Sequence, residues 1–157
     1  MRSEIFGYQL HPVDLATNKV LALAGRDEPR DLIDTLFLHD TLLPLGGLVW
    51  AAAGKDPGYS PLSLLEMLRR RGRVRPEDLR RLELAGDLDV TQLKADWDAA
   101  LQAAEAFVRS RPAAEAGCLY WSPSAKVFVL PTAEGGGEAA PHFGRPGGVV
   151  PRVLERG

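Results

Sequence analysis

One segment, His11 to Asp40, constrains the fold more than any other part of this 157-residue chain. Apolar residues recur there at helical spacing on both sides of Pro29, which indicates two helices joined by a short link. Pro12 suits the first position of the first helix, and Gly25 is expected just past its last residue. The second helix is expected to begin at Asp31, which suits its N-terminal end. Its expected core-facing residues are Leu32, Ile33, Leu36 and Phe37.

Charged residues lie beside the apolar stripes of both helices. Lys19 is on the flank of the first stripe, and Arg30, Asp31 and Asp34 open the second helix. Asp31 and Asp34 share one helix face, and Arg30 and Asp34 have the spacing of a surface ion pair. Two interpretations stay open. The lysine and the two carboxylates form a seat for a triphosphate, or they form a structural ion-pair cluster in which the lysine stem covers apolar surface.

The run from Asp14 to Arg26 (DLATNKVLALAGR), followed by Pro29 to Asp34 (PRDLID), resembles the second half of the AbiEii-type nucleotidyltransferase family. That family includes the toxins of type IV toxin–antitoxin systems. The shared pattern is a lysine on one helix, a short basic link, and Arg-Asp-x-x-Asp opening the next helix. The resemblance is specific over residues 7 to 40 and continues in layout to about residue 131. It implies transfer of a nucleoside monophosphate from an NTP substrate to an acceptor such as tRNA.

The same resemblance assigns roles to residues of the helix pair. It implies that Lys19 binds the nucleotide phosphates and that Asp34 assists catalysis, so these two are the expected catalytic residues. Arg26, Arg30 and Asp31 are expected to support nucleotide binding. These assignments come from the family pattern and not from the spacing of the residues alone.

The motif that holds Mg²⁺ in this family is not found upstream of Lys19. Nucleotidyl transfer depends on metal ions, which the family binds on an N-terminal sheet with a Gly-Ser turn and an Asp-x-Asp strand. We therefore expect no metal site in this chain, Mg²⁺ only together with a missing N-terminal half, and no complete activity for the isolated polypeptide. The Asp-x-Asp of Asp87 and Asp89 lies downstream, where Asp89 suits the cap of the next helix.

Seven arginines lie between residues 69 and 81, the highest concentration of charge in the chain. Four of them form a weak candidate for binding the RNA backbone, which contacts cations without regard to base sequence. These four are Arg69, Arg70, Arg71 and Arg73. The alternative is structural, since cations are favoured at the C-terminal ends of helices. No aromatic residues alternate with these arginines, which argues against single-stranded binding by base stacking.

The rest of the pattern predicts a mainly α protein: a helical bundle of about six helices with a short N-terminal strand and a small C-terminal β-hairpin. The expected helices are 12–24, 31–40, 45–53, 61–71, 76–84 and 90–110. The expected hairpin joins 117–121 to 126–130, and the N-terminal strand, 4–10, pairs with that hairpin, with another chain or not at all. Residues 1–131 are expected to form one helical domain, followed by a Gly/Pro/Ala-rich tail, 132–157, without regular structure.

Composition excludes several classes of protein. The net charge of −2 supplies no overall attraction to nucleic acid or to a membrane surface, so any such contact must be local. The longest apolar run, 42–54, is too short and too interrupted by Pro and Gly to cross a bilayer. The single cysteine, Cys118, excludes an internal disulfide framework and fits a reducing cytoplasm. It is expected to be a buried, unreactive thiol.

Two functions from different classes follow. The first is the nucleotide-contacting half of an AbiEii-like nucleotidyltransferase, whose partners are a nucleotide, tRNA, a separately encoded N-terminal half and an antitoxin, with no membrane involved. The second is a non-catalytic α-helical module that binds RNA or a protein. Nucleotide binding that depends on Lys19 distinguishes the first from the second.

Overall fold

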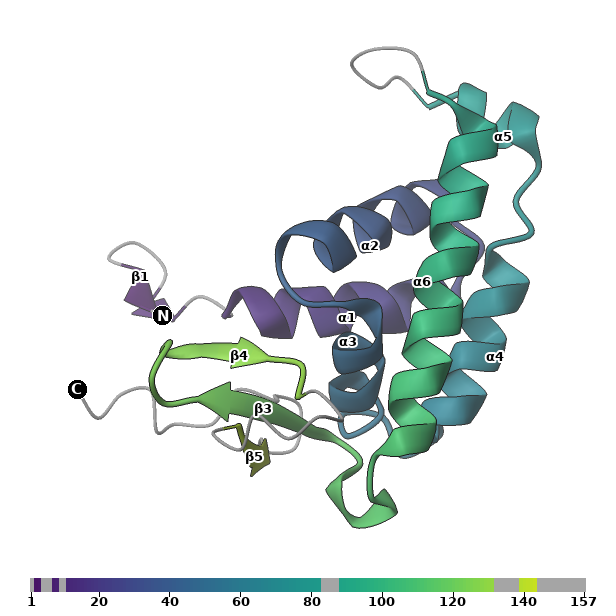
Figure 1. The fold of residues 1–157 in the computed structure, drawn as a ribbon. Helices are drawn as coiled ribbons and strands as arrows, with labels where there is room; N and C mark the ends of the chain where they lie inside the picture. The colour runs from purple at the N-terminus through teal and green to yellow at the C-terminus, as the bar shows by residue number, and fades with distance from the viewer. Residues whose placement is uncertain (1, 4–6, 9–10, 83–87, 132–138, 144–157) are drawn as a thin grey trace.

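The computed structural model describes residues 2–3, 7–8, 11–82, 88–131 and 139–143. Within these residues the chain is mainly α-helical, as the apolar periodicity predicts, with a small antiparallel sheet near its C-terminal end (Figure 1). The α-helices are α1 (Pro12–Gly25), α2 (Pro29–Thr41), α3 (Leu45–Ala52), α4 (Pro61–Arg71), α5 (Pro76–Arg80) and α6 (Val90–Ser110). A 3₁₀ turn, Ala113–Glu115, leads from α6 into the sheet.

Helix α3 lies at the centre of the bundle, and every one of its residues is buried. This follows from its sequence, LGGLVWAA, which is apolar on all sides. Helices α1, α4 and α6 pack around it, with α6 running alongside (Figure 1). A Cβ atom added to Gly46 would lie 3.1 Å from the Cβ of Phe107 on α6. Gly46 therefore lets the backbones of α3 and α6 approach each other closely, and α3 can be buried among the helices around it.

The predicted C-terminal hairpin is confirmed and gains a third strand. Strand β3 (Cys118–Ser122) lies between β4 (Val127–Val129) and β5 (Ala140–Phe143), antiparallel to both. The stretch that contains β5 was expected to carry no strand, because it is rich in Gly, Ala and Pro. Pairing uses backbone groups and needs no apolar side chain, and Pro141 is tolerated because β5 is an edge strand. The buried residues of β3 include Cys118, which has no exposed surface.

The predicted N-terminal strand, 4–10, is only partly realised. Strands β1 (Arg2–Ser3) and β2 (Gly7–Tyr8) pair with each other, antiparallel, and not with the C-terminal hairpin. Residues 4–6 and 9–10 lie outside the described residues. Pairing within this short segment closes a much smaller loop than pairing with residues about 110 positions away, which costs less chain entropy.

The ends of the first two helices differ from the prediction. Gly25 is the last residue of α1 and does not adopt a left-handed conformation; the extended Arg26 ends the helix and donates its backbone N–H to Ala22. Helix α2 begins at Pro29, not at Asp31, and Glu28 is its cap. The link between the helices is therefore Arg26, Asp27 and Glu28 alone, and Asp31 lies inside the first turn of α2.

The apolar stripe of α2 is narrower than predicted. Leu32 and Leu36 are buried and Ile33 is partly buried, but Phe37 is 64% exposed. Phe37 follows Leu36 by about 100° around the helix, which carries it past the surface that α1 and α3 cover. At the start of α6 the predicted cap is confirmed, since the Asp89 carboxylate accepts the backbone N–H of Gln92. Asp87 lies outside the described residues.

No single helix of the described residues has both the length and the apolar character needed to cross a membrane. Helices α2 and α3 meet the test only as a pair, and they are bent by 112° at the break between them.

Gly54, after α3, and Gly117, before β3, lie in close contact, and substitution of Gly117 tests this backbone contact between the helices and the sheet. Gly117 has φ +96°, and its added Cβ would lie 2.9 Å from the Cα of Gly54. We expect Gly117→Ala to lower the free energy of unfolding by about 2 kcal/mol or more, because both the conformation and the contact oppose a side chain. Urea denaturation followed by circular dichroism measures this change.

Gly25→Ala is the matched control. Gly25 lies in helical conformation at the end of α1, and an added Cβ would have no heavy atom within 4 Å. This substitution should leave stability unchanged or raise it by up to about 1 kcal/mol. Equal losses for the two alanine variants would contradict the proposed backbone contact.

Candidate functional site

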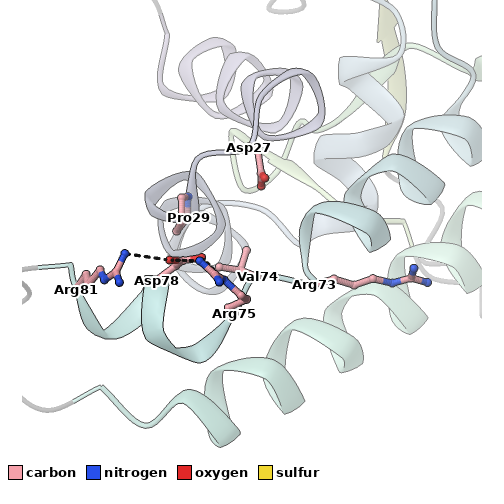
Figure 2. A pocket seen from close by; sticks show the side chains of 7 residues that line it. All are labelled: Asp27, Pro29, Arg73, Val74, Arg75, Asp78 and Arg81. Carbon is pink, nitrogen blue, oxygen red and sulfur yellow. Dashed lines mark hydrogen bonds and ion pairs between the residues drawn. The ribbon is translucent and has the colours of Figure 1, made fainter.

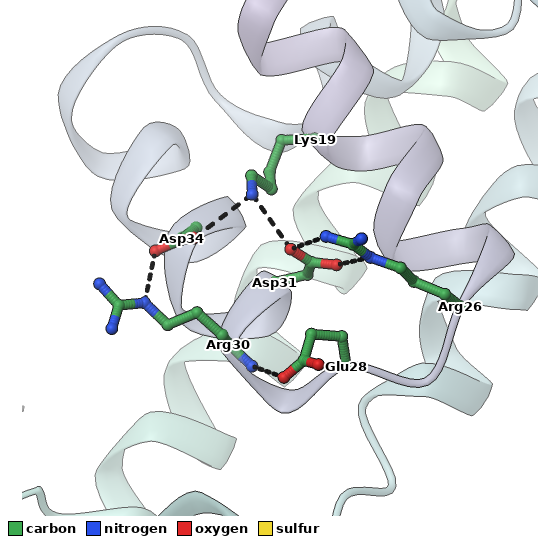
Figure 3. Close-up of polar contacts among 6 residues, drawn as sticks. All are labelled: Lys19, Arg26, Glu28, Arg30, Asp31 and Asp34. Atoms are coloured by element: carbon green, nitrogen blue, oxygen red, sulfur yellow. Dashed lines mark hydrogen bonds and ion pairs between the residues drawn. The ribbon is translucent and has the colours of Figure 1, made fainter. Parts of the chain in front are cut away.

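Lys19 on α1 and two aspartates on α2 meet where the two helices pack together. The Lys19 ammonium lies 3.1 Å from Oδ1 of Asp31 and 3.4 Å from Oδ2 of Asp34 (Figure 3). The convergence of these groups, which the spacing of the helix pair predicts, is therefore present. Lys19 is 30% exposed and Asp34 is 31% exposed, so both groups reach solvent at the edge of the helix pair.

The short link between the helices positions these groups. The Glu28 carboxylate accepts the backbone N–H of Arg30, and Pro29 occupies the first position of α2, where no N–H is needed. Starting the helix at Pro29 puts Asp31 in the first turn, where a negative charge interacts favourably with the helix dipole. Arg26, in extended conformation at the end of α1, reaches the same carboxylate.

Asp31 is the buried centre of the cluster, with only 1% of its side chain exposed. Arg26 donates from Nε to Oδ2 at 2.7 Å and from Nη2 to Oδ1 at 3.2 Å, and Lys19 donates to Oδ1. The hydrogen bonds from Arg26, followed by the one from Lys19, hold the pKa of Asp31 below its usual value despite burial. Asp31 is therefore favoured as a carboxylate, and it holds Lys19 of α1 and Arg26 of the link.

The same contacts favour the protonated, positively charged form of Lys19. Its hydrogen bond to Asp31, with smaller contributions from the charges of Asp31 and Asp34, raises its pKa above the usual value. An ammonium held this firmly does not act as a general base or a nucleophile at neutral pH. What it can do is donate hydrogen bonds and positive charge to an anion.

Asp34 and Arg30 form the exposed edge of the cluster. Arg30 donates from Nε to Oδ1 of Asp34 at 3.2 Å, and Lys19 lies against the other carboxylate oxygen (Figure 3). An exposed pair of this kind contributes little to stability, on the order of 0.5 kcal/mol. Asp34 is therefore the member of the cluster that can be released to a ligand at least cost.

The aspartates of the cluster do not fit Mg²⁺, the metal that the family resemblance implies. Both oxygens of Asp31 and both oxygens of Asp34 already face cationic side chains. The part of the chain that the structure describes contains no group of three or more His, Cys, Asp or Glu residues arranged to hold a metal ion. No chemical step is therefore assigned to a metal at these residues.

A further Asp-x-Asp, for which no metal site was predicted, also fails as one. Asp96 and Asp98 lie within α6 on either side of the buried Trp97. Residues two positions apart on a helix point to different sides, so their carboxylates diverge. Asp96 instead accepts a hydrogen bond of 2.7 Å from Gln92 one turn earlier.

The four arginines predicted to bind RNA do not gather at one surface. Arg69 pairs with Glu105 on α6 at 3.3 Å, and Arg70 pairs with Glu66 of its own helix at 3.7 Å. Arg71 donates to the backbone carbonyl of Ala24 at 3.2 Å, which ties α4 to the end of α1. Consecutive helical residues point about 100° apart, which explains this dispersal. Arg73, beyond the helix, lines a separate cavity.

A buried lysine at the other end of α1 was not predicted. Lys55, in the turn after α3, is only 4% exposed and lies 3.2 Å from Oδ1 of Asp14. Its ammonium also donates to the carbonyl of Asp14 at 3.1 Å and to Oδ1 of Asn18 at 2.9 Å. Because its partners are about 40 positions earlier in the chain, no local pattern pointed to this contact. It fastens the turn to α1.

Comparison with known proteins found no match among family models, curated proteins or solved structures. The function proposed for the chain is therefore inferred from the geometry of the site and the chemistry of its residues.

The buried carboxylate of Asp31 provides a test of the cluster. We expect Asp31→Asn to lower the free energy of unfolding by about 2 kcal/mol, because the amide group turns one acceptor into a donor facing cations. Asp34→Asn, at an exposed position, should cost less than about 1 kcal/mol. Urea denaturation at pH 7 compares the two variants. Equal losses would contradict the central role of Asp31.

The contribution of Asp31 should also depend on pH. Because the pKa of Asp31 is lower in the folded chain than in the unfolded chain, its stabilisation is present above about pH 4 and is lost as the pH falls through the folded value. The difference in unfolding free energy between wild type and Asp31→Asn should therefore shrink below pH 4. Urea denaturation from pH 7 to pH 2.5 measures it, and a difference that stays constant over this range would contradict the assignment.

Proposed function

We propose that the chain is the nucleotide-contacting half of an AbiEii-like nucleotidyltransferase, which transfers a nucleoside monophosphate from an NTP to an RNA acceptor such as tRNA. The observation that carries this proposal is the partly exposed ammonium of Lys19, held between Asp31 and Asp34 at the edge of the helix pair. A lysine with a raised pKa keeps its charge at neutral pH and suits contact with phosphate oxygens.

The arginines beside Lys19 support the same proposal. Arg26 uses Nε and Nη2 on Asp31, and Arg30 uses only Nε on Asp34, so each keeps N–H groups that can donate to a phosphate. Arg26 and Arg30 are more than half exposed, at 61% and 52%. A triphosphate placed along this edge contacts the cations of Lys19, Arg26 and Arg30. Asp31 holds two of them, Lys19 and Arg26, in place.

The transfer step is proposed as follows. A hydroxyl oxygen of the acceptor attacks the α-phosphorus of the NTP, a new P–O bond forms, and the bond to the departing pyrophosphate breaks. Asp34, released from Lys19 when the phosphates bind, accepts the hydroxyl proton. Lys19 and Arg30 neutralise charge on the pyrophosphate. The metal-holding groups belong to a separately encoded partner in this proposal, and a type IV antitoxin is a further proposed partner.

A second candidate function is a non-catalytic helical module that binds RNA or a protein. The observation that favours it is that the carboxylates of Asp31 and Asp34 already neutralise the cations around them. Such a cluster joins α1 to α2 without any ligand. The two candidates differ in whether nucleotide affinity depends on Lys19.

Nucleotide binding by variants of Lys19 tests the proposal. We expect the purified chain to bind a fluorescent ATP analogue weakly and Lys19→Gln to reduce that affinity at least 10-fold, because the ammonium contacts the phosphates. Fluorescence anisotropy measures the affinity. Lys126→Gln, the same change at an exposed lysine of the β-turn, is the control and should bind as wild type does.

Two outcomes would contradict the proposal. One is unchanged affinity in Lys19→Gln, which would favour the non-catalytic module. The other is equal loss in Lys19→Gln and Lys126→Gln, which would indicate an unspecific charge effect. Incubation of the 157-residue chain with labelled NTPs and total tRNA should give no labelled RNA, since Asp31 and Asp34 do not fit a metal ion.

A further inference from the structure

A cavity with a volume of about 450 Å³ lies at the link between α1 and α2, apart from the ion cluster of Lys19, Asp31 and Asp34, none of which lines it (Figure 2). It is formed by that link, by the segment between α4 and α5, and by α5 itself. Among the described residues, three arginines and two aspartates line it, and together they carry a net positive charge. The lining residues are Asp27, Pro29, Arg73, Val74, Arg75, Asp78 and Arg81.

Two of the three arginines share one carboxylate. Arg75 donates to Asp78 from Nε at 3.2 Å and from Nη2 at 3.4 Å, and Nη1 of Arg81 lies 3.6 Å from the same aspartate. Asp78 therefore balances only one of these two positive charges, and N–H groups of both arginines stay available to a ligand.

Arg73 and Asp27 make no ion pair or side-chain hydrogen bond with any part of the chain that the structure describes. Arg73 extends along the rim of the cavity, away from Asp78, and Asp27 points toward the cavity from the opposite wall (Figure 2). Since no partner holds the Arg73 guanidinium, turning it toward a bound anion breaks no existing contact.

The segment that carries Arg73 and Arg75 is fixed by contacts of its backbone. Lys94 of α6 donates to the carbonyl of Val74 at 2.7 Å. An added Cβ at Gly72 would lie 2.4 Å from Nε1 of the buried Trp97, so the backbone runs directly over that ring. These contacts hold the backbone of this one wall in place, so the long side chains of Arg73 and Arg75 are the parts of it that turn toward a ligand.

We propose that this cavity binds a phosphate group of a ribonucleotide, with the phosphate on Arg73, Arg75 and Arg81. Arginine is suited to phosphate because its planar fork donates two parallel hydrogen bonds. Asp27, which has no side-chain partner among the described residues, accepts a ribose hydroxyl of the same nucleotide, a contact that a simple anion site would not need. The described lining includes no aromatic side chain, so the proposed contact is to the sugar and phosphate and not to the base.

This second site does not depend on nucleotide transfer at Lys19. Arg26 and Asp27 are consecutive, but Arg26 pairs with Asp31 while Asp27 lines the cavity. Binding at the cavity should therefore survive Lys19→Gln. The two proposals can fail separately.

Anisotropy of a fluorescein-labelled single-stranded RNA of 12 nucleotides, at about 50 mM salt, tests the site in the full chain. We expect Arg73→Ala to weaken binding 3- to 10-fold and to make the slope of log K against log salt less negative by about 0.7. Arg109→Ala removes the same charge from an exposed position of α6 and is the matched control, expected to change affinity less than 2-fold. DNA of the same sequence should bind more weakly than RNA.

Competition with ATP distinguishes the two sources of the phosphate. If ATP displaces the RNA from the Lys19→Gln variant, the cavity binds a terminal phosphate. If ATP does not displace it, the cavity binds a phosphodiester of the RNA backbone. Absence of RNA and ATP binding, or equal effects of Arg73→Ala and Arg109→Ala, would overturn the proposal. Equal affinity for RNA and DNA would overturn the role of Asp27.

Discussion

A carboxylate with almost no exposed surface, that of Asp31, is the constraint on which the packing of α1 against α2 depends. A charge taken out of water costs several kcal/mol unless it is paired and hydrogen-bonded. Asp31 meets this requirement with donors that all come from α1 and the residue after it, Lys19 and Arg26. Any sliding of one helix along the other separates these groups, so the ion cluster sets the register of the helix pair.

The same arrangement limits the chemistry of the site. Lys19 and Arg26 are held in place as cations, and the exposed Asp34 is the one carboxylate of this group that a ligand can displace easily. The site thus offers fixed positive charge beside a carboxylate that can be released, and the proposed contact with phosphate depends on this arrangement. Holding a divalent cation requires free oxygens that this cluster does not have.

Much of the fold follows from local patterns, and the deviations have physical reasons. Apolar periodicity predicted the six helices, and the expected pairing of the first two helices predicted that Lys19 meets the two aspartates. Periodicity tells which face a residue occupies but not how deeply it is buried, so the complete burial of Asp31 did not follow. Lys55 could not be predicted, because its contact with Asp14 joins segments far apart in the chain. Strand β5 was not predicted, because strands pair through backbone groups and the amino-acid composition of 140–143 does not indicate that pairing.

The three-residue link between α1 and α2 has a consequence for communication across the molecule. Arg26 belongs to the ion cluster and Asp27 to the neighbouring cavity, yet the two share one peptide bond. A ligand that shifts the backbone of this link at one of the two sites also repositions a side chain, Arg26 or Asp27, at the other site. By thermodynamic linkage, such coupling is mutual: whatever factor the first guest imposes on the affinity for the second, the second imposes on the first.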